Sequence, residues 1–243
     1  MEKKYAIITG AAKGMGKDIA FKFAIEGYHV FLITRKSINE LHSFSEDLEK
    51  FGASYTEIIG DVGNPQDIEK IKNTIFSITD YVDVLVNNAG IAHIGLLQNM
   101  SNEDWDEIIK TNLNSVFYMS KMVIPSMIHK KAGSIINISS MWGSVGASME
   151  VAYSASKGGV ESFTKALSKE LAPSGIAVNA ISPGVVNTSM NSHLSKKELE
   201  NLALEIPAGR FATTSEIADL VWNVANSPSY MTGQVIGING GYI

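Results

Sequence analysis

The stretch TGAAKGMG at residues 9–16 joins an apolar run, Tyr5 to Thr9, directly to the start of an amphipathic helix. Short apolar runs alternate with longer amphipathic segments along the rest of the chain. Strands that are apolar on both faces, each followed by a helix, are typical of a parallel sheet with helices packed on both faces. We therefore predict an α/β fold, a single doubly wound Rossmann-type domain with a parallel sheet of about seven strands.

The expected elements follow from these runs. Strands are expected at 5–9, 29–34, 55–59, 82–86, 134–138, 177–181 and 234–238, and helices at 16–26, 37–51, 65–78, 103–129, 150–171 and 215–226. No linker, composition shift or repeat divides the chain, so one domain is expected to cover residues 1–243. The longest irregular stretch runs from about Pro183 to Pro207. Its part from about 185 to 207 follows a strand and is the expected substrate lid.

The composition excludes several classes of protein. The 243 residues carry a net charge of −5, which gives no basic surface for nucleic acid or an anionic membrane. The chain has no cysteine, which excludes thiolate zinc sites, and its five histidines show no metal-ligand spacing, so no metal is expected. No apolar run approaches the roughly 18–20 residues of a membrane span, and the N-terminus does not read as a secretory signal. We expect a cytoplasmic protein.

The glycine-rich turn is the first candidate site. Glycines allow backbone amides to approach a pyrophosphate, and the following helix offers unpaired N–H groups at its positive end. At the end of the second strand, where an acidic residue often binds the ribose hydroxyls of NAD, this chain has Thr34-Arg35. Lys13 lies in the turn itself, and two cations without an acid favour the 2′-phosphate of NADP(H). The alternatives are a turn without a ligand and two solvated surface charges.

A second candidate site begins at the helix expected from Glu150. Tyr153 and Lys157 are four residues apart, so they share one helix face. A neighbouring ammonium favours the phenolate and brings the phenol pKa down from about 10 toward neutral, which suits general acid–base chemistry. Ser139-Ser140 ends the fifth strand and supplies a hydroxyl that can bond a substrate carbonyl. Taken singly, each pair also suits a surface contact or a turn.

Together these residues form a pattern that resembles the short-chain dehydrogenase/reductase family. The ordered motifs are TGAAKGMG at 9, DV at 61, NNAG at 87, Asn112, NISS at 137, YSASK at 153 and SPG at 182. The resemblance covers essentially the whole chain and implies an NADP(H)-dependent oxidoreductase that interconverts a ketone and a secondary alcohol.

The resemblance also implies roles for single residues. Tyr153 is expected to be the general acid, Lys157 to lower its pKa and bond the nicotinamide ribose, Ser140 to orient the carbonyl, and Asn112 to hold a water. The expected cofactor-binding residues are Gly10, Lys13, Gly14, Met15, Gly16, Thr34, Arg35, Asp61, Val62, Asn88, Gly90, Tyr153, Lys157, Pro183, Gly184, Val186 and Thr188.

Two substrate classes stay open. The tail at 206–243 is similar to the branch that contains 3-oxoacyl-acyl-carrier-protein reductases, which implies a carrier-bound β-keto thioester docked near Lys130 and Lys131. The stretches SSMWGSVGASMEVAYSASK at 139–157 and MNSHLS at 190–195 resemble 5-aminopentanone reductases that act on modified elongation factor P. In that interpretation Trp142 and Glu150 shape a pocket for a short cationic ketone.

Two further expectations concern activity and assembly. Some members of this family are nucleotide-sensing regulators without activity, but these typically lose the tyrosine or the lysine, and both are present here. The segment 103–129 is apolar on more than one face, which suggests a contact between subunits. Because relatives are commonly tetramers built on this helix and the next one, we expect a homotetramer.

Overall fold

Seven parallel strands form the centre of the protein, in the order β3-β2-β1-β4-β5-β6-β7. The computed structural model describes residues 3–192 and 194–243. The predicted doubly wound α/β fold is confirmed, and every predicted strand lies within two residues of an observed one. The strands are β1 (Lys4–Thr9), β2 (Tyr28–Thr34), β3 (Ser54–Ile59), β4 (Val84–Asn87), β5 (Gly133–Ile138), β6 (Ile176–Pro183) and β7 (Val235–Ile238).

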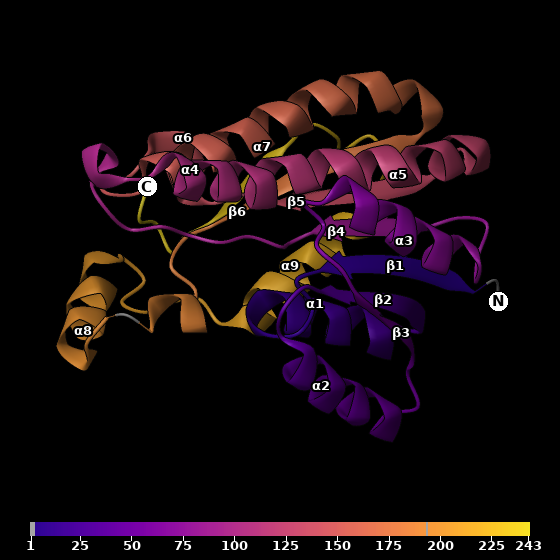
Figure 1. Cartoon of the computed structure of the whole chain (residues 1–243), viewed down its shortest axis with the longest axis horizontal. Coiled ribbons are helices and arrows are strands. Elements are labelled where there is room, and N and C mark those ends of the chain that lie inside the picture. Colours follow the sequence, from indigo (N-terminus) through magenta and orange to yellow (C-terminus); the bar gives the residue numbers. More distant parts are fainter. Residues whose placement is uncertain (1–2, 193) are drawn as a thin grey trace.

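Helices cover both faces of this sheet (Figure 1). One layer contains α1, α2 and α9, and the other contains α3, α5 and α7. The nine α-helices of the described residues are α1 (Gly14–Ile25), α2 (Ile38–Lys50), α3 (Pro65–Phe76), α4 (Asn102–Ile109), α5 (Ser115–Lys130), α6 (Met141–Val145), α7 (Val151–Leu171), α8 (Lys196–Glu205) and α9 (Thr214–Ala225).

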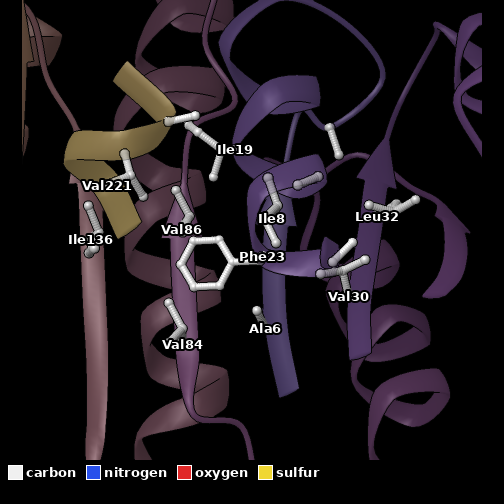
Figure 2. Close-up of a cluster of buried hydrophobic side chains, with 14 of the residues drawn as sticks. Ala6, Ile8, Ile19, Phe23, Val30, Leu32, Val84, Val86, Ile136 and Val221 are labelled. Carbon is white, nitrogen blue, oxygen red and sulfur yellow. The ribbon is translucent and has the colours of Figure 1, made fainter. Parts of the chain in front are cut away.

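Alternate residues of the strands enter two separate cores. Ile8 of β1 packs with Phe23 of α1 and Val221 of α9 on one face of the sheet (Figure 2). Its neighbour Ile7 packs on the opposite face with Met119 of α5 and other residues of α3 and α7. Both side chains of β1 are fully buried, because successive strand residues point to opposite sides. This two-sided burial explains why the strands are continuous apolar runs in the sequence.

The chain order in the sheet reverses between β1 and β4. β1 pairs with β2 on one side and with β4 on the other, so the connections leave the sheet in opposite directions at this point. Such a reversal opens a crevice outside the carboxyl ends of the strands, where ligands bind in open α/β sheets. The glycine turn after β1 and the NNAG stretch at the end of β4 both lie at this crevice.

The segment expected as one helix at 103–129 is not regular, and that prediction was wrong in its middle. α4 and α5 are joined by a π-helical turn at Lys110–Asn114. Inside this turn the Asn112 side chain donates to the Ile91 carbonyl at 2.9 Å and accepts from the Ile91 N–H at 2.8 Å. Hydrophobic periodicity does not reveal a one-residue insertion of this kind, which is often found at functional sites.

The stretch expected to be irregular at 183–207 contains helix α8, which begins with a capping box. The Ser195 hydroxyl accepts from the Glu198 N–H at 3.4 Å, and the Glu198 carboxylate accepts from the Ser195 N–H at 2.8 Å. This signal was present in the sequence at the expected spacing. The stretch and the MNSHLS motif include residue 193, which lies outside the described residues.

Two features of the described residues bear on function: the character of their helices and the grouping of side chains that could bind a metal. None of their helices combines the length and the apolar character needed to cross a membrane. No group of three or more His, Asp or Glu side chains within 3–192 and 194–243 converges where it could hold a metal ion.

Candidate active site

The turn after β1 requires glycine at the positions where the sequence places it. Gly10 and Gly14 have φ angles of +67° and +57°, a backbone conformation that side chains disfavour. A Cβ on Gly16 would lie 2.1 Å from the Gly10 carbonyl oxygen, so no larger residue fits there. Asn88 supports the turn from β4, because its amide donates to the Thr9 carbonyl at 2.9 Å. The turn is therefore rigidly built and close to the crevice.

Helix α1 begins at this turn without a side-chain cap. By contrast, the side chains of Asn64 and Ser101 cap α3 and α4. The first residues of α1 line a cleft of about 170 Å³, and uncapped amides at the positive end of a helix suit a phosphate. The cleft is lined by Gly10, Ala12, Lys13, Gly14, Met15, Gly16, Thr34, Ser37, Asn88, Ala89, Gly90, Thr188, Ser189 and Met190.

A second cavity of about 320 Å³ lies beside the cleft and shares Met15, Thr188 and Met190 with it. Its walls are mainly apolar, with polar groups from three segments that are distant in sequence. It is lined by Met15, Ala92, Ile94, Ser139, Ser140, Met141, Trp142, Glu150, Tyr153, Pro183, Gly184, Val185, Val186, Thr188, Met190, Asn191, Leu194 and Leu202. Ser140 and Tyr153 thus share one cavity, next to the cleft that suits a dinucleotide.

Lys157 lies behind Tyr153. The Nζ atom is 5.7 Å from the centre of the Tyr153 ring and donates to the Ile138 carbonyl at 2.7 Å. Burial lowers the pKa of Lys157 to about 8, which places its proton loss near neutral pH. The predicted proximity of these two side chains is confirmed by this geometry.

The expected effect on the phenol pKa differs from what the structure shows. Burial raises the pKa of Tyr153 to about 12, while a hydrogen bond with Ser140 acts in the opposite direction. The Lys157 ammonium is directed to the Ile138 carbonyl rather than to the phenol oxygen, so it does not offset this burial. The prediction of a phenol pKa below 10 in the protein alone was therefore wrong. A protonated phenol is the form that can donate a proton.

Asn112 and Gly90 lie next to Lys157. Asn112 is fully buried, and its amide also donates to the Ser156 hydroxyl at 3.0 Å. A Cβ on Gly90 would lie 3.4 Å from Asn112 Oδ1 and 3.5 Å from Lys157 Nζ, so both groups are neighbours of Gly90. Asn112 and Lys157 are buried and line neither cavity.

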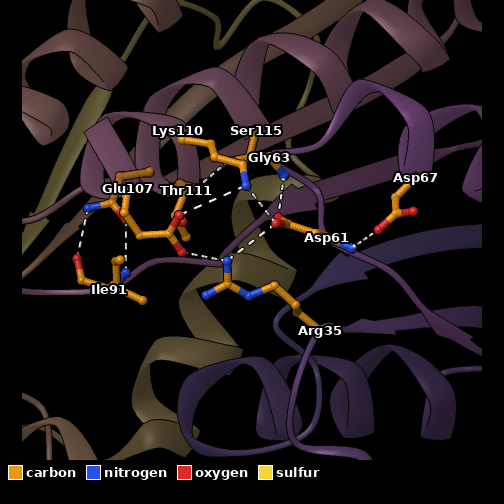
Figure 3. A network of polar contacts seen from close by, with 10 residues as sticks. Arg35, Asp61, Gly63, Asp67, Ile91, Glu107, Lys110, Thr111 and Ser115 are labelled. Carbon is orange, nitrogen blue, oxygen red and sulfur yellow. Dashed lines mark hydrogen bonds and ion pairs between the residues drawn. The ribbon is translucent and has the colours of Figure 1, made fainter. Parts of the chain in front are cut away.

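Arg35, Asp61 and Val62 line neither cavity and lie at the ends of β2 and β3, although Thr34 and Ser37 beside Arg35 line the cleft. Val62 is buried. Arg35 Nη1 donates to Glu107 Oε1 at 2.6 Å and to Asp61 Oδ2 at 3.3 Å (Figure 3). Burial alone would raise the pKa of Asp61, but hydrogen bonds from Gly63, Lys110 and Arg35 hold it below its ordinary value. Arg35 is thus ion-paired in the protein alone, and is not the solvated surface charge that was the alternative to a phosphate-binding role.

Glu161 is a buried carboxylate that was not predicted. It lies one helical turn after Lys157 and is 6% exposed. Its Oε1 accepts from the Ser139 hydroxyl at 3.0 Å, and both oxygens accept from Ser144 at 3.1 Å. Ser139 precedes Ser140 and Ser144 lies within the short helix α6, so Glu161 holds the segment that carries Ser140 and Trp142 at two points.

The C-terminal segment contacts the cavity and helix α8. The Tyr242 hydroxyl donates to Glu205 Oε2 at 2.8 Å, and its ring lies edge-on to Trp142 with centroids 6.0 Å apart. Leu202 of α8 and Trp142 both line the larger cavity. Tyr242 therefore connects α8 to a wall of this cavity, a contact that local sequence patterns do not indicate.

The chain belongs to the short-chain dehydrogenase family, whose model, described as short chain dehydrogenase, matches residues 4–199. It is an oxidoreductase of the class that acts on CH–OH and C=O groups. Among its relatives, "Uncharacterized oxidoreductase YmfI" of Bacillus subtilis is 39% identical over 241 residues, 98% of each chain. A 3-oxoacyl-acyl-carrier-protein reductase, FabG of Thermotoga maritima, is 41% identical over 249 residues, covering 100% of this chain and 99% of the relative.

A solved structure gives the same classification. An actinorhodin polyketide ketoreductase variant with NADPH superimposes with a TM-score of 0.94 at 34% identity, covering 99% of this chain and 97% of that one. The family predicted from the seven motifs is thereby confirmed.

Proposed function

We propose that this protein is an NADPH-dependent reductase that converts a ketone to a secondary alcohol, most like the 3-oxoacyl-acyl-carrier-protein reductases. The observation that carries the proposal is the placement of Tyr153 and Ser140 in one cavity that shares walls with the glycine-turn cleft. The names of the relatives at about 40% identity support the same reaction.

The residues of the cleft fit a nicotinamide dinucleotide. The uncapped first turn of α1 and the close approach of Gly16 to Gly10 suit a pyrophosphate. Pro183, Gly184, Val186 and Thr188 border the larger cavity and would hold the nicotinamide end, with Asn88 and Gly90 on the ribose side and Asp61 and Val62 near the adenine. When bound, the reduced cofactor supplies a hydride to the carbonyl carbon.

The protein supplies the proton and the orientation. The Tyr153 hydroxyl donates its proton to the carbonyl oxygen as negative charge develops there, and the Ser140 hydroxyl donates a hydrogen bond to the same oxygen. The buried Lys157 ammonium lies near the Tyr153 ring and stabilises the phenolate left behind. Asn112 holds the backbone at Ile91 beside Lys157 and is the proposed site of the water that links Lys157 to solvent.

The walls of the larger cavity support a β-keto thioester as the first substrate class. Ile94, Met141, Met190, Leu194 and Leu202 give it an apolar lining that suits an acyl chain. A second class is favoured by one observation, the carboxylate of Glu150 in the same wall. A ketone that carries an amino group would place its ammonium there, as a 5-aminopentanone substrate would.

Parallel assays distinguish these functions. NADPH oxidation, followed at the nicotinamide absorbance band, is compared for an acetoacetyl thioester and for aminopentanone-modified elongation factor P. A faster rate with the thioester supports the first class. A faster rate with the aminoketone, together with loss of that preference in Glu150→Gln, supports the second. Cofactor binding without turnover on any ketone would instead support a nucleotide sensor.

Two structural proposals accompany the function. Residues from about 185 to 207 form the substrate lid, since Val186, Met190, Asn191, Leu194 and Leu202 line the cavity. We also propose a homotetramer, supported by the exposed apolar surface of α5, where Phe117 is 44% exposed. Light scattering at micromolar concentration tests the assembly, and a single monomer-sized species would contradict it.

A further inference from the structure

Four charged side chains form a neutral cluster at the ends of β2 and β3 (Figure 3). Arg35 pairs with Glu107 at 2.6 Å and with Asp61 at 3.3 Å. Lys110 pairs with Asp61 at 3.0 Å and lies 3.9 Å from Glu107 Oε2. Two cations and two carboxylates balance, so Arg35 does not present a net positive site by itself. This matters because Arg35 is the residue expected to meet the nucleotide 2′-phosphate.

The two carboxylates of the cluster are not equivalent. Asp61 is held by Lys110 and by the Gly63 N–H at 2.8 Å, so it stays in place without Arg35. Glu107 has its shortest contact with Arg35, and its side chain is 39% exposed. A phosphate that approaches Arg35 carries about two negative charges and is repelled by a carboxylate on the same guanidinium nitrogen. Because Asp61 has these other partners, Glu107 is the carboxylate freer to move away from Arg35.

We propose that Glu107 competes with the nucleotide 2′-phosphate for Arg35 and so limits the preference for NADP(H) over NAD(H). The proposal rests on the proposed use of NADP(H). Lys13 provides the contrast, because the described residues show no ion pair at its side chain, and it is available to the phosphate directly. Because of Glu107, Arg35 contributes less to binding of the 2′-phosphate than an arginine without an ion pair would. Glu107 is thus a specificity-determining residue that lies outside both cavities.

Calorimetric titrations with NADP⁺, NAD⁺ and adenosine 2′,5′-bisphosphate test this proposal. Glu107→Gln should tighten binding of NADP⁺ and of the bisphosphate about three- to fivefold, the size of one partly exposed ion pair, and leave NAD⁺ unchanged. The gain should shrink as salt is raised. Asp106→Asn is the matched control, because it removes the same charge from an exposed position of the same helix and should leave all three affinities unchanged. In an Arg35→Ala background Glu107→Gln should have no effect.

The outcomes separate the two proposals. In one outcome, wild type prefers NADP⁺, but Glu107→Gln binds NADP⁺ no more tightly than Asp106→Asn or more weakly than wild type. This outcome overturns the role of Glu107 and leaves the proposed function intact. Wild type that binds NAD⁺ as tightly as NADP⁺ overturns the NADP(H) assignment, and the competition is rejected as well if Glu107→Gln does not then tighten NADP⁺ binding. A gain that persists without Arg35 also contradicts the competition, because the charge would then act on the phosphate directly.

Discussion

Lys157 Nζ lies 5.7 Å from the centre of the Tyr153 ring and donates its hydrogen bond to the Ile138 carbonyl, not to the phenol. Stabilisation of a phenolate by this ammonium would lower the phenol pKa, but in the protein alone the ammonium is directed to the Ile138 carbonyl instead. Burial raises the pKa of Tyr153 to about 12 and lowers that of Lys157 to about 8, so the phenol is protonated in the protein alone. Tyr153 therefore carries the proton that reduction of a carbonyl needs.

The buried Lys157 ammonium should destabilise the fold at neutral pH. Its folded pKa of about 8 is below the ordinary 10.5, so the unfolded chain binds the extra proton between pH 8 and 10.5. Below pH 8 both states are protonated and the full cost of burial is present, and it is relieved as pH rises through that window. Lys157→Met should therefore raise the free energy of unfolding by about 2 kcal/mol at pH 7, after the lost hydrogen bond is counted.

The measurement is urea unfolding of both proteins from pH 7 to pH 10. The advantage of Lys157→Met should narrow as pH rises above 8, while turnover is lost at every pH. Lys165→Met, at an exposed position of the same helix, should show no such pH dependence. A gap between wild type and Lys157→Met that is constant across this range would contradict the depressed pKa.

Glu161 should act as a positioning residue for Ser140. Glu161→Ala removes the acceptor of Ser139 and Ser144 and should lower kcat about tenfold, with NADPH affinity almost unchanged, because orientation of the carbonyl is disturbed. Glu161→Gln keeps one oxygen acceptor and should restore most of kcat. Steady-state kinetics and NADPH titration check this, and equal losses in the two variants would contradict the role.

The contact between Tyr242 and Glu205 should influence substrate binding. Tyr242→Phe removes the hydrogen bond to α8 and keeps the ring against Trp142, so KM for the ketone should rise about threefold while kcat and NADPH affinity stay the same. Tyr230→Phe is the control, because Tyr230 is 99% exposed. An unchanged KM, or an equal change in the control, would show that this contact does not act on the lid.

The sequence predicted the parts of the site that lie in short, continuous motifs. Gly16 and Tyr153 belong to segments where a few neighbouring residues define the local structure, and the alternation of apolar runs defined the sheet. Glu107, Glu161 and Tyr242 were not predicted, because their partners lie 72, 22 and 37 residues away. Such pairs are set by the tertiary fold, which no local pattern encodes.

Two incorrect predictions, one of a regular helix and one of a pKa, have the same kind of cause. The π-helical turn at Lys110–Asn114 leaves the apolar periodicity of its helix almost intact, and it is held by Asn112 contacts with Ile91, which lies 21 residues earlier. The pKa of Tyr153 was expected to fall because the charge of the neighbouring Lys157 ammonium favours a phenolate. The burial that instead raises this pKa depends on the packing of the whole domain.

The proposed chemistry is tested most directly by the rate of NADPH oxidation with an acetoacetyl thioester, compared between wild type and Tyr153→Phe at equal cofactor saturation. Wild type should consume NADPH only when the ketone is present. Tyr153→Phe keeps the ring but loses the transferable proton, so its rate should fall about 10³-fold while its NADPH affinity stays within about twofold. If the variant retained most of the wild-type rate, Tyr153 could not be the proton donor.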